Sequence, residues 1–355
     1  MRSLVDGLCS FAGRGACTDA ERRAALWLHR QIAAEAFVET RWVRPQRWAV
    51  KALGCLLAAA GGLLAVAVPA VGLAVAALGA LSLAIEAVGR VGPLRLLFPR
   101  RATQHVLTAV PTGGVPLVIA AAYDAPKRGL ALNKRRRRRR LPRGTLAACG
   151  ALVTATAAAR VAGVEAPWLG AVQLAPTVAL LGTLAAAVDV ALSGWAPGAN
   201  DSASGVAVAL TLFEELSREP PRTLAPALLL VGAGHAEPRA ADDYVDGVLL
   251  ELGPCGLGRP AVRARHPQAE AAAARAAEAL GAGTRGARPT AAGARIACLG
   301  ERGIVPRAHQ EDDTEVDEAA MEAALDLALG VVDALDAELC GPPAGPSNAA
   351  SVGPA

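Results

Sequence analysis

The chain has 355 residues, and 36 lysines and arginines against 32 aspartates and glutamates give it a formal charge of +4 at pH 7. Hydrophobic residues make up 53% of the chain and charged residues only 19%, against about a quarter in ordinary soluble domains. This composition excludes a disordered chain and indicates that part of the protein lies in lipid. Seven positive charges form one unbroken run, which begins at Lys134 and ends at Arg140. The excess charge is therefore concentrated at one place, unlike that of a generally basic nucleic-acid-binding protein.

The seven cysteines are odd in number, lie far apart and include no Cys-x-x-Cys pair. This pattern excludes a disulfide framework and a thiolate zinc site, and it indicates a reducing compartment. The first residues lack the apolar core of a signal peptide, so we expect any membrane insertion to be internal.

Two long apolar blocks interrupt the chain after a helix that is expected over residues 18–36. The first block, residues 52–85, has no charge and has Pro69 at its middle. A single helix of that length would measure roughly 50 Å, well over the ~30 Å hydrocarbon core of a bilayer, so two short spans that turn near Pro69 fit better. The second block, residues 145–192, is broken by Arg160, Glu165 and Pro167, which predicts a second hairpin. The alternative for both blocks is a set of alanine-rich helices in the core of a soluble domain.

Positive charges lie beside the predicted hairpins, whereas the hairpin tips have only Arg160. By the positive-inside rule, we expect a multi-pass protein of the cytoplasmic membrane whose long connecting segments lie on the cytoplasmic side. The flanking charges are Arg41, Arg44, Arg47 and Lys51 before the first hairpin, Arg90, Arg95, Arg100 and Arg101 after it, and the run over residues 134–140 with Arg143 before the second.

The basic run also resembles a nuclear-localisation or nucleic-acid-binding patch. It has no interleaved aromatic residue on which a base could stack, and it lies directly beside a predicted span. We therefore interpret the run from Lys134 to Arg140 as a membrane flank that contacts anionic lipid, and we expect no nucleic-acid partner.

The remaining segments alternate between strands and helices, which predicts an α/β domain with a largely parallel sheet. Apolar strands are expected over residues 116–122, 225–232 and 248–253, and helices over residues 205–217, 271–280 and 318–339. The Pro/Gly/Ser/Ala-rich tail, residues 341–355, is expected to be disordered. The α/β domain would comprise residues 1–48, 91–144 and 194–340, and the transmembrane hairpins would comprise residues 49–90 and 145–193.

The most informative string covers residues 197–205, Pro-Gly-Ala-Asn-Asp-Ser-Ala-Ser-Gly, and an apolar helix follows it. It places the Asp201 carboxylate in a glycine-rich turn just before a helix N-terminus. The string closely resembles the Gly-x-x-Asp-Asn-Ala-Ser-Gly signature of the di-zinc aminopeptidase family, which includes glutamate carboxypeptidase-like and glutaminyl-cyclase-like proteins. Three further segments are similar to motifs of that family: residues 11–25 to its opening segment, residues 118–125 to its strand ending in His-Tyr-Asp, and residues 309–314 to its late His-x-x-x-Asp-Thr.

The resemblance implies a zinc-exopeptidase-like fold: a three-layer α/β/α domain with a mixed, mostly parallel sheet, here interrupted by the two hairpins. In the family, one zinc is bound by the His of His-x-Asp, a bridging Asp and a later acidic residue. The other zinc is bound by the bridging Asp, a Glu and the late His, and a second Glu is the general base.

Most of these positions can be matched one at a time. Asp201 matches the bridging Asp, His309 the late His, and Glu251 the later acidic ligand. The position of the first zinc's His is occupied by Ala122, so that site loses a ligand. Two residues are expected to support the site without binding metal, namely Asp124 and Asp313.

The Glu-Glu pair of the family is also altered. Alignment of residues 229–236 without a gap places Gly234 at the general base and His235 at the zinc ligand. A slip of one or two residues would instead place Glu237 at the ligand position and Ala236 at the base. The gapless register is favoured because it keeps the strand end fixed, but in either register one member of the pair is missing.

The retained donors are Asp201, His235 and His309, three N/O ligands, which is the number that a catalytic zinc uses. We therefore expect one zinc ion rather than two, or none. The loss of a general base is more serious, because such a group contributes about 10²- to 10⁴-fold to the rate. Glu237 and Glu251 are weak candidates for that role.

Two hypotheses remain open. The first is a membrane-embedded, zinc-dependent metallopeptidase-like protein that hydrolyses an amide bond at the amino terminus of a peptide. The second is a non-catalytic pseudopeptidase that serves as a membrane-anchored binding or scaffold module for a peptide, a lipid or a protein.

Overall fold

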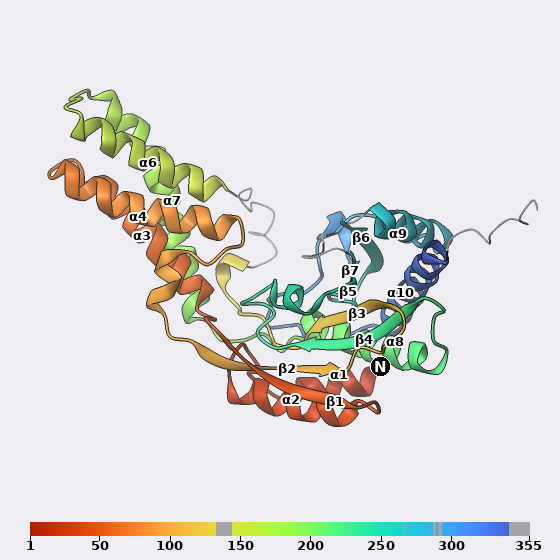
Figure 1. The fold of residues 1–355 in the computed structure, drawn as a ribbon. Helices are drawn as coiled ribbons and strands as arrows, with labels where there is room; N and C mark the ends of the chain where they lie inside the picture. The colour runs from red at the N-terminus through yellow and green to blue at the C-terminus, as the bar shows by residue number, and fades with distance from the viewer. Residues whose placement is uncertain (133–143, 266, 287–288, 290–292, 341–355) are drawn as a thin grey trace, which may run out of the picture.

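The computed structural model describes residues 1–132, 144–265, 267–286, 289 and 293–340. The basic run over residues 134–140 and the tail over residues 341–355 therefore lie outside the described residues. Figure 1 shows an α/β domain from which a bundle of helices projects.

The sheet has seven strands in the order β1-β2-β4-β3-β5-β7-β6. Its centre is parallel, because β4, β3, β5 and β7 pair in parallel, while β1, β2 and β6 are antiparallel to their neighbours. This confirms the mixed, mainly parallel sheet. The strands are β1 (Ala36–Val43), β2 (Arg101–Thr108), β3 (Val115–Ala122), β4 (Leu224–Val231), β5 (Val248–Leu252), β6 (Arg259–Ala264) and β7 (Gly293–Leu299).

Alternate side chains of the central strands enter two separate cores. One core joins Leu117, Ile119 and Leu230 to helices α1 (Arg2–Cys9), α2 (Asp19–Gln31), α8 (Gly205–Arg218), α9 (Pro267–Ala279) and α10 (Glu318–Leu339). The helix predicted over residues 18–36 is too long, since α2 ends at Gln31 and Ala36 opens strand β1.

The opposite face of the sheet has a smaller apolar cluster. Its apolar cluster contains Val118 and Leu229 and is covered by the short 3-10 helix η4 (Ala240–Tyr244), and none of its members within the described ranges belongs to an α-helix. The 3-10 helix η4 therefore packs on this face of the central strands.

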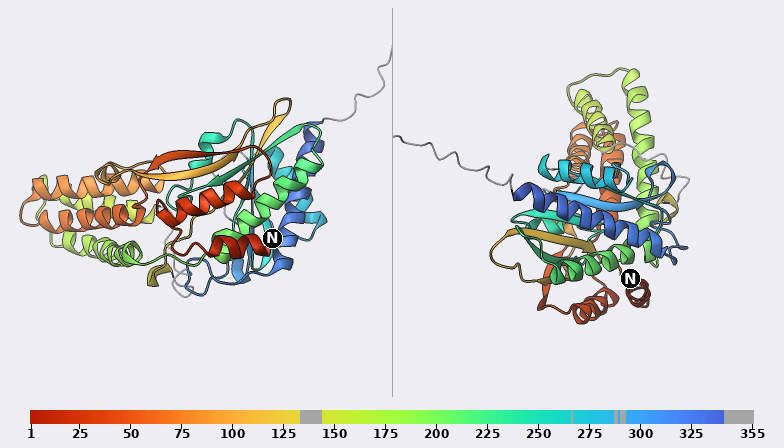
Figure 2. Two further views of the ribbon diagram at one scale, coloured as in Figure 1. Left: turned by 90° about the horizontal axis from the view of Figure 1, so that it is seen from below. Right: turned by 90° about the vertical axis from the view of Figure 1, so that its right-hand side faces the viewer.

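Four apolar helices form the bundle: α3 (Arg47–Leu64), α4 (Pro69–Ala87), α6 (Thr145–Val161) and α7 (Trp168–Leu192). They correspond to the two predicted hairpins, and Pro69 begins α4, where a proline is tolerated. Contacts run from α3 to α4, from α4 to α6, from α6 to α7 and from α7 back to α3, and Figures 1 and 2 show the four projecting together. Three of them, α3, α4 and α7, are long and apolar enough to cross a membrane, whereas α6 is shorter.

Small residues bring α3 and α4 into close contact. A Cβ added at Gly61 would lie 2.3 Å from the Ala76 nitrogen, and one added at Gly72 would lie 2.2 Å from the Ala65 nitrogen. Such backbone approach through glycine and alanine is typical of helices that pack within a bilayer. Large apolar side chains are exposed on the bundle helices, including Leu63 of α3, Val71 of α4, and Leu174 and Val178 of α7.

Candidate functional site

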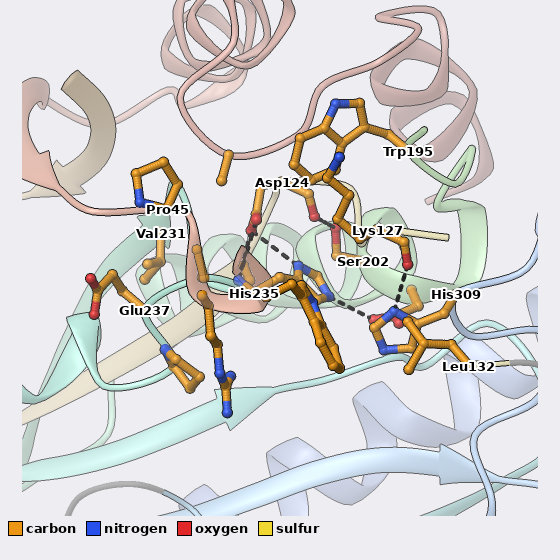
Figure 3. Close-up of a pocket in the computed structure, with 18 of the residues that line it drawn as sticks. Pro45, Asp124, Lys127, Leu132, Trp195, Ser202, Val231, His235, Glu237 and His309 are labelled. Atoms are coloured by element: carbon orange, nitrogen blue, oxygen red, sulfur yellow. Dashed lines mark hydrogen bonds and ion pairs between the residues drawn. The ribbon is translucent and has the colours of Figure 1, made fainter. Parts of the chain in front are cut away.

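The predicted site residues gather at the carboxyl edge of the central strands, where ligands bind in open α/β sheets. Asp124 follows β3, His235 follows β4, and Glu251 lies in β5. Asp201 lies in the segment η3 (Ala199–Ser204), and His309 lies in the loop before α10. All five line one cavity of about 890 Å³, part of which is drawn in Figure 3.

Buried contacts hold the loop that presents Asp201. Gly198 adopts the left-handed conformation with φ +74°, and the buried Arg14 guanidinium donates to its carbonyl oxygen over 2.7 Å. The Asp313 carboxylate accepts hydrogen bonds from the backbone nitrogens of Asn200 (2.9 Å) and Asp201 (3.1 Å). Burial raises the pKa of Asp313 to about 6. Buried hydrogen bonds from Arg14 and to Asp313 therefore hold the loop in place.

His235 lies between two carboxylates, as the dashed lines in Figure 3 show. Its Nδ1 is 3.2 Å from Asp124 Oδ1, and its Nε2 is 3.1 Å from Asp201 Oδ1. Burial alone would lower the pKa of His235, but the two carboxylates outweigh it and raise that pKa to about 10. In this arrangement the ring is an imidazolium at neutral pH.

His309 stands beside this group, with its ring centroid 6.2 Å from that of His235. It has a left-handed backbone with φ +64°, and its Nδ1 lies 3.0 Å from the Lys127 carbonyl oxygen. The Lys127 ammonium donates to the carbonyl oxygens of Ala191 (3.2 Å) and Ser193 (2.6 Å) at the end of α7 and lies over the Trp195 ring. Lys127 thus connects the site to the bundle.

Both glutamates considered as general bases lie in ion pairs. Glu251 Oε2 lies 3.4 Å from the Arg295 guanidinium of β7, its partner in the strand register. Glu237 forms an ion pair with Arg95, and burial raises the pKa of Glu237. In Figure 3, Glu237 lies apart from His235. The Nε2 atom of His235 faces Asp201 Oδ1.

Gly234 aligns with the general base of the resembled family, and the surrounding atoms leave little space for a side chain there. A Cβ added at Gly234 would lie 2.6 Å from the Ala122 Cβ and 3.4 Å from Asp124 Oδ1. The two substituted positions therefore face each other, and a side chain at residue 234 requires movement of its neighbours.

A di-zinc centre does not fit these residues. Ala122 offers no donor atom, Glu251 is paired with a cation, and both ring nitrogens of His235 face carboxylates. Within residues 1–132, 144–265 and the later described segments, no three His, Cys, Asp or Glu side chains form a group that could hold a metal ion.

Sequence reasoning missed the cations of the site. Arg295 and Lys127 carry no motif, and Arg295 meets Glu251 only through the pairing of β5 with β7. Glu21 was also missed: its buried carboxyl group accepts hydrogen bonds from the backbone nitrogens of Ala233 (2.6 Å) and Cys17 (2.7 Å), so it fixes the turn before His235.

Comparisons with known proteins agree with the motif. No protein-family model matches the sequence, and no curated protein matches it. Among solved structures, BSAP, a zinc aminopeptidase from Bacillus subtilis, is similar at a TM-score of 0.52 and 13% identity over 93% of this chain and 92% of that one.

Two proteins of Bacteroides thetaiotaomicron are also similar. A leucine aminopeptidase precursor has a TM-score of 0.50 and 11% identity over 93% of this chain and 94% of that one. A glutaminyl cyclase has a TM-score of 0.50 and 11% identity over 93% of this chain and 95% of that one. The chain therefore has the fold of the zinc aminopeptidases and glutaminyl cyclases, the family that its Asp201 motif resembles.

Proposed function

We propose that this protein is a membrane-anchored binding protein built on the peptidase fold, and that it does not hydrolyse peptides. The observation that carries the proposal is the Asp124–His235–Asp201 group, in which an imidazolium satisfies the two carboxylates around it. In this arrangement the cation beside the two carboxylates is supplied by the protein itself.

The environment of the remaining carboxylates supports the same conclusion. A general base must lie within hydrogen-bond reach of the attacking water and be free to accept a proton. Glu237 and Glu251 are both ion-paired, and residue 234 is a glycine in a closed position. Hydrolysis at this site would lack the factor of about 10² to 10⁴ that general base catalysis supplies.

The bundle is proposed to anchor the protein as a multi-pass membrane protein. Three of its helices are long and apolar enough to span, and glycine contacts between α3 and α4 are of the kind used in lipid. The positive charges that flank the hairpins would place the α/β domain in the cytoplasm. The run from Lys134 to Arg140, outside the described residues, is proposed to contact anionic lipid.

The test is metal content by mass spectrometry on detergent-purified full-length protein, together with hydrolysis of aminoacyl amides. We expect substoichiometric zinc that His309→Ala does not change, and no hydrolysis above that of a mock preparation. Stoichiometric zinc that is lost in Asp201→Asn, with hydrolysis lost in parallel, would overturn the proposal.

A second candidate is a hydrolase with one zinc ion at Asp201, His235 and His309. It is favoured by one observation: each histidine Nδ1 lies beside an oxygen, of Asp124 or of the Lys127 carbonyl, as is usual for metal-bound histidines. Bound zinc would supply Lewis-acid activation of water. The same metal analysis separates the two candidates.

A further inference from the structure

The chain between α4 and β2 turns back along the bundle before it enters the sheet. Helix α4 ends at Ala87, yet Gly92 is buried against Ser82 of the same helix. A Cβ added at Gly92 would lie 2.8 Å from Ser82 Oγ and 3.0 Å from the Ser82 carbonyl oxygen. Ser82 lies roughly 7.5 Å before the end of α4, at 1.5 Å per residue. The short 3-10 helix η1 (Pro93–Leu97) therefore begins beside the bundle and not beyond its end.

The length of α4 indicates how deep η1 would lie in a bilayer. Its 19 residues measure roughly 28 Å, close to the ~30 Å hydrocarbon core. A helix of this length reaches from one boundary of the core to the other, so its last residue, Ala87, would lie where the acyl chains meet the head groups. Because η1 packs on both α3 and α4 and begins level with Ser82, it would lie at the same boundary.

The side chains of η1 include a buried pair and an exposed pair. Leu94 and Arg95 are buried, whereas Leu96 is 60% exposed and Leu97 is 72% exposed. Further exposed apolar side chains precede this pair along the chain: Leu78 and Leu81 in α4, and Val88 and Val91 in the turn before η1. Apolar exposure thus continues from the bundle into η1, which is the pattern of an interaction surface rather than of a single exposed leucine.

Arg95 holds η1 in this orientation. Its guanidinium donates to the Arg44 carbonyl oxygen over 2.8 Å and forms an ion pair with Glu237. It also interacts with Glu86 near the end of α4. Since Glu237 follows His235 by two residues, the loop after His235 is connected directly to η1.

Exposed arginines lie on both sides of the exposed leucines in the sequence, Arg90 before them and Arg100 after them. In segments that lie in a membrane surface, such long basic side chains extend toward the head groups while the apolar side chains enter the boundary below. A soluble protein partner fits this surface less well, because the surface is level with helices whose own exposed side chains are apolar. The observations therefore favour the lipid bilayer as the partner.

We propose that η1 and the turn before it form an interfacial segment, in which Leu96 and Leu97 enter the boundary between the lipid head groups and the acyl chains. The inference rests on the part of the proposed function that places the bundle in a membrane. Through Arg95, this contact holds the loop after His235 at the membrane surface. It does not depend on what the site binds or on whether it hydrolyses a substrate.

Photo-crosslinking of the full-length protein in liposomes of phosphatidylcholine and phosphatidylglycerol tests this. The amino acid p-benzoylphenylalanine, which reacts with neighbouring C–H bonds on irradiation, replaces Leu97 in one variant and Leu96 in a second. Lipid adducts are then measured by mass spectrometry of the digested protein. A side chain of an interfacial segment lies roughly 5–10 Å deep in the boundary, so we expect both variants to form adducts with acyl chains.

Two matched positions calibrate the yield. Val178 is 58% exposed near the middle of α7, and the same replacement there should form abundant lipid adducts. Leu280 is 50% exposed just after α9, which Figure 1 shows on the side of the domain away from the bundle. We expect about fivefold more adduct or better at Leu96 and Leu97 than at Leu280, because that residue would lie in water rather than at the lipid boundary.

Adducts at Val178 together with yields at Leu96 and Leu97 no higher than at Leu280 would overturn the inference and leave the membrane placement of the bundle standing. Crosslinks from Leu97 to a second copy of the chain, in place of lipid, would also overturn it, because the surface would then be a protein interface. Absence of adducts at Val178 as well would contradict the proposed membrane anchoring, and this inference with it. Zinc content and hydrolysis, measured on the same protein, test the rest of the proposed function separately.

Discussion

The loop over residues 198–204 and the ends of strands β3 and β4 lie at the same edge of the sheet, yet they carry different parts of the site. The loop has Asp201 held by buried partners, Arg14 and Asp313. At the strand ends, Ala122 and Gly234 lie close together. In the resembled family these two positions hold a zinc ligand and a general base. The difference is that the acidic loop has its own buried hydrogen-bond partners, which do not include the residues at the ends of β3 and β4 opposite it.

The substitution Arg14→Ala should have the largest effect on the loop over residues 198–204. The Arg14 guanidinium donates to the carbonyl oxygens of Tyr123, Pro197 and Gly198, so its removal leaves buried acceptors without partners. We expect a loss of about 3 kcal/mol or more in the free energy of unfolding, measured by thermal or denaturant unfolding in detergent. Arg22→Ala, on exposed helix surface, should change it by less than about 0.5 kcal/mol. Similar values for the two variants would show that the loop does not need its buried guanidinium.

The contact between α3 and α4 in the bundle can be tested in the same way, because it too depends on a glycine that leaves no space for a side chain. Gly61→Val would insert a side chain where a Cβ already lies 2.3 Å from the Ala76 nitrogen. We expect a destabilisation of about 1–3 kcal/mol from overpacking, measured as a lower thermal midpoint. Gly182→Val on α7 is the matched control, since an added Cβ there meets nothing within 4 Å. A control that lost as much stability would indicate an effect of helix propensity rather than packing.

The closed strand ends can be examined with a double-mutant cycle. Gly234→Ala should cost about 1–2 kcal/mol, because the new Cβ would lie 2.6 Å from the Ala122 Cβ. Ala122→Gly in the same chain should recover part of that loss, and the coupling energy between the two changes measures the contact. Additive effects in unfolding experiments would mean that the two positions do not touch.

Whether a strand could be predicted from the sequence depends on its position in the sheet. The central strands β3, β4 and β5 were predicted because a strand buried on both faces is a continuous apolar run. Strands β1 and β2 were missed because residues such as Glu39, Arg41 and Gln104 interrupt their apolar pattern. Strands β6 and β7 carry Arg263 and Arg295 and were missed for the same reason.

The site was predicted only as far as the motif extends. Residues Asp201 and His235 come together as the motif and the gapless register imply. The ion pair between Glu251 and Arg295 was not predicted, since the register of β5 on β7 is a tertiary property that neither segment encodes alone. The metal-ligand role of Asp201, His235, His309 and Glu251 stays a prediction.

Glu21 tests how the turn before His235 is held. Burial first, and then the charge of Asp124, raises the pKa of Glu21 from 4.5 to about 8. The folded protein therefore keeps a proton between pH 4.5 and 8 that the unfolded chain releases, so the free energy of unfolding should fall as the pH rises through this window. Glu21→Gln should flatten that slope in unfolding experiments at several pH values, while Asp19→Asn, at the exposed start of the same helix, should leave it unchanged. An unchanged slope in Glu21→Gln would mean that another group binds the proton, and Asp313, whose pKa is raised to about 6, would be examined next by Asp313→Asn.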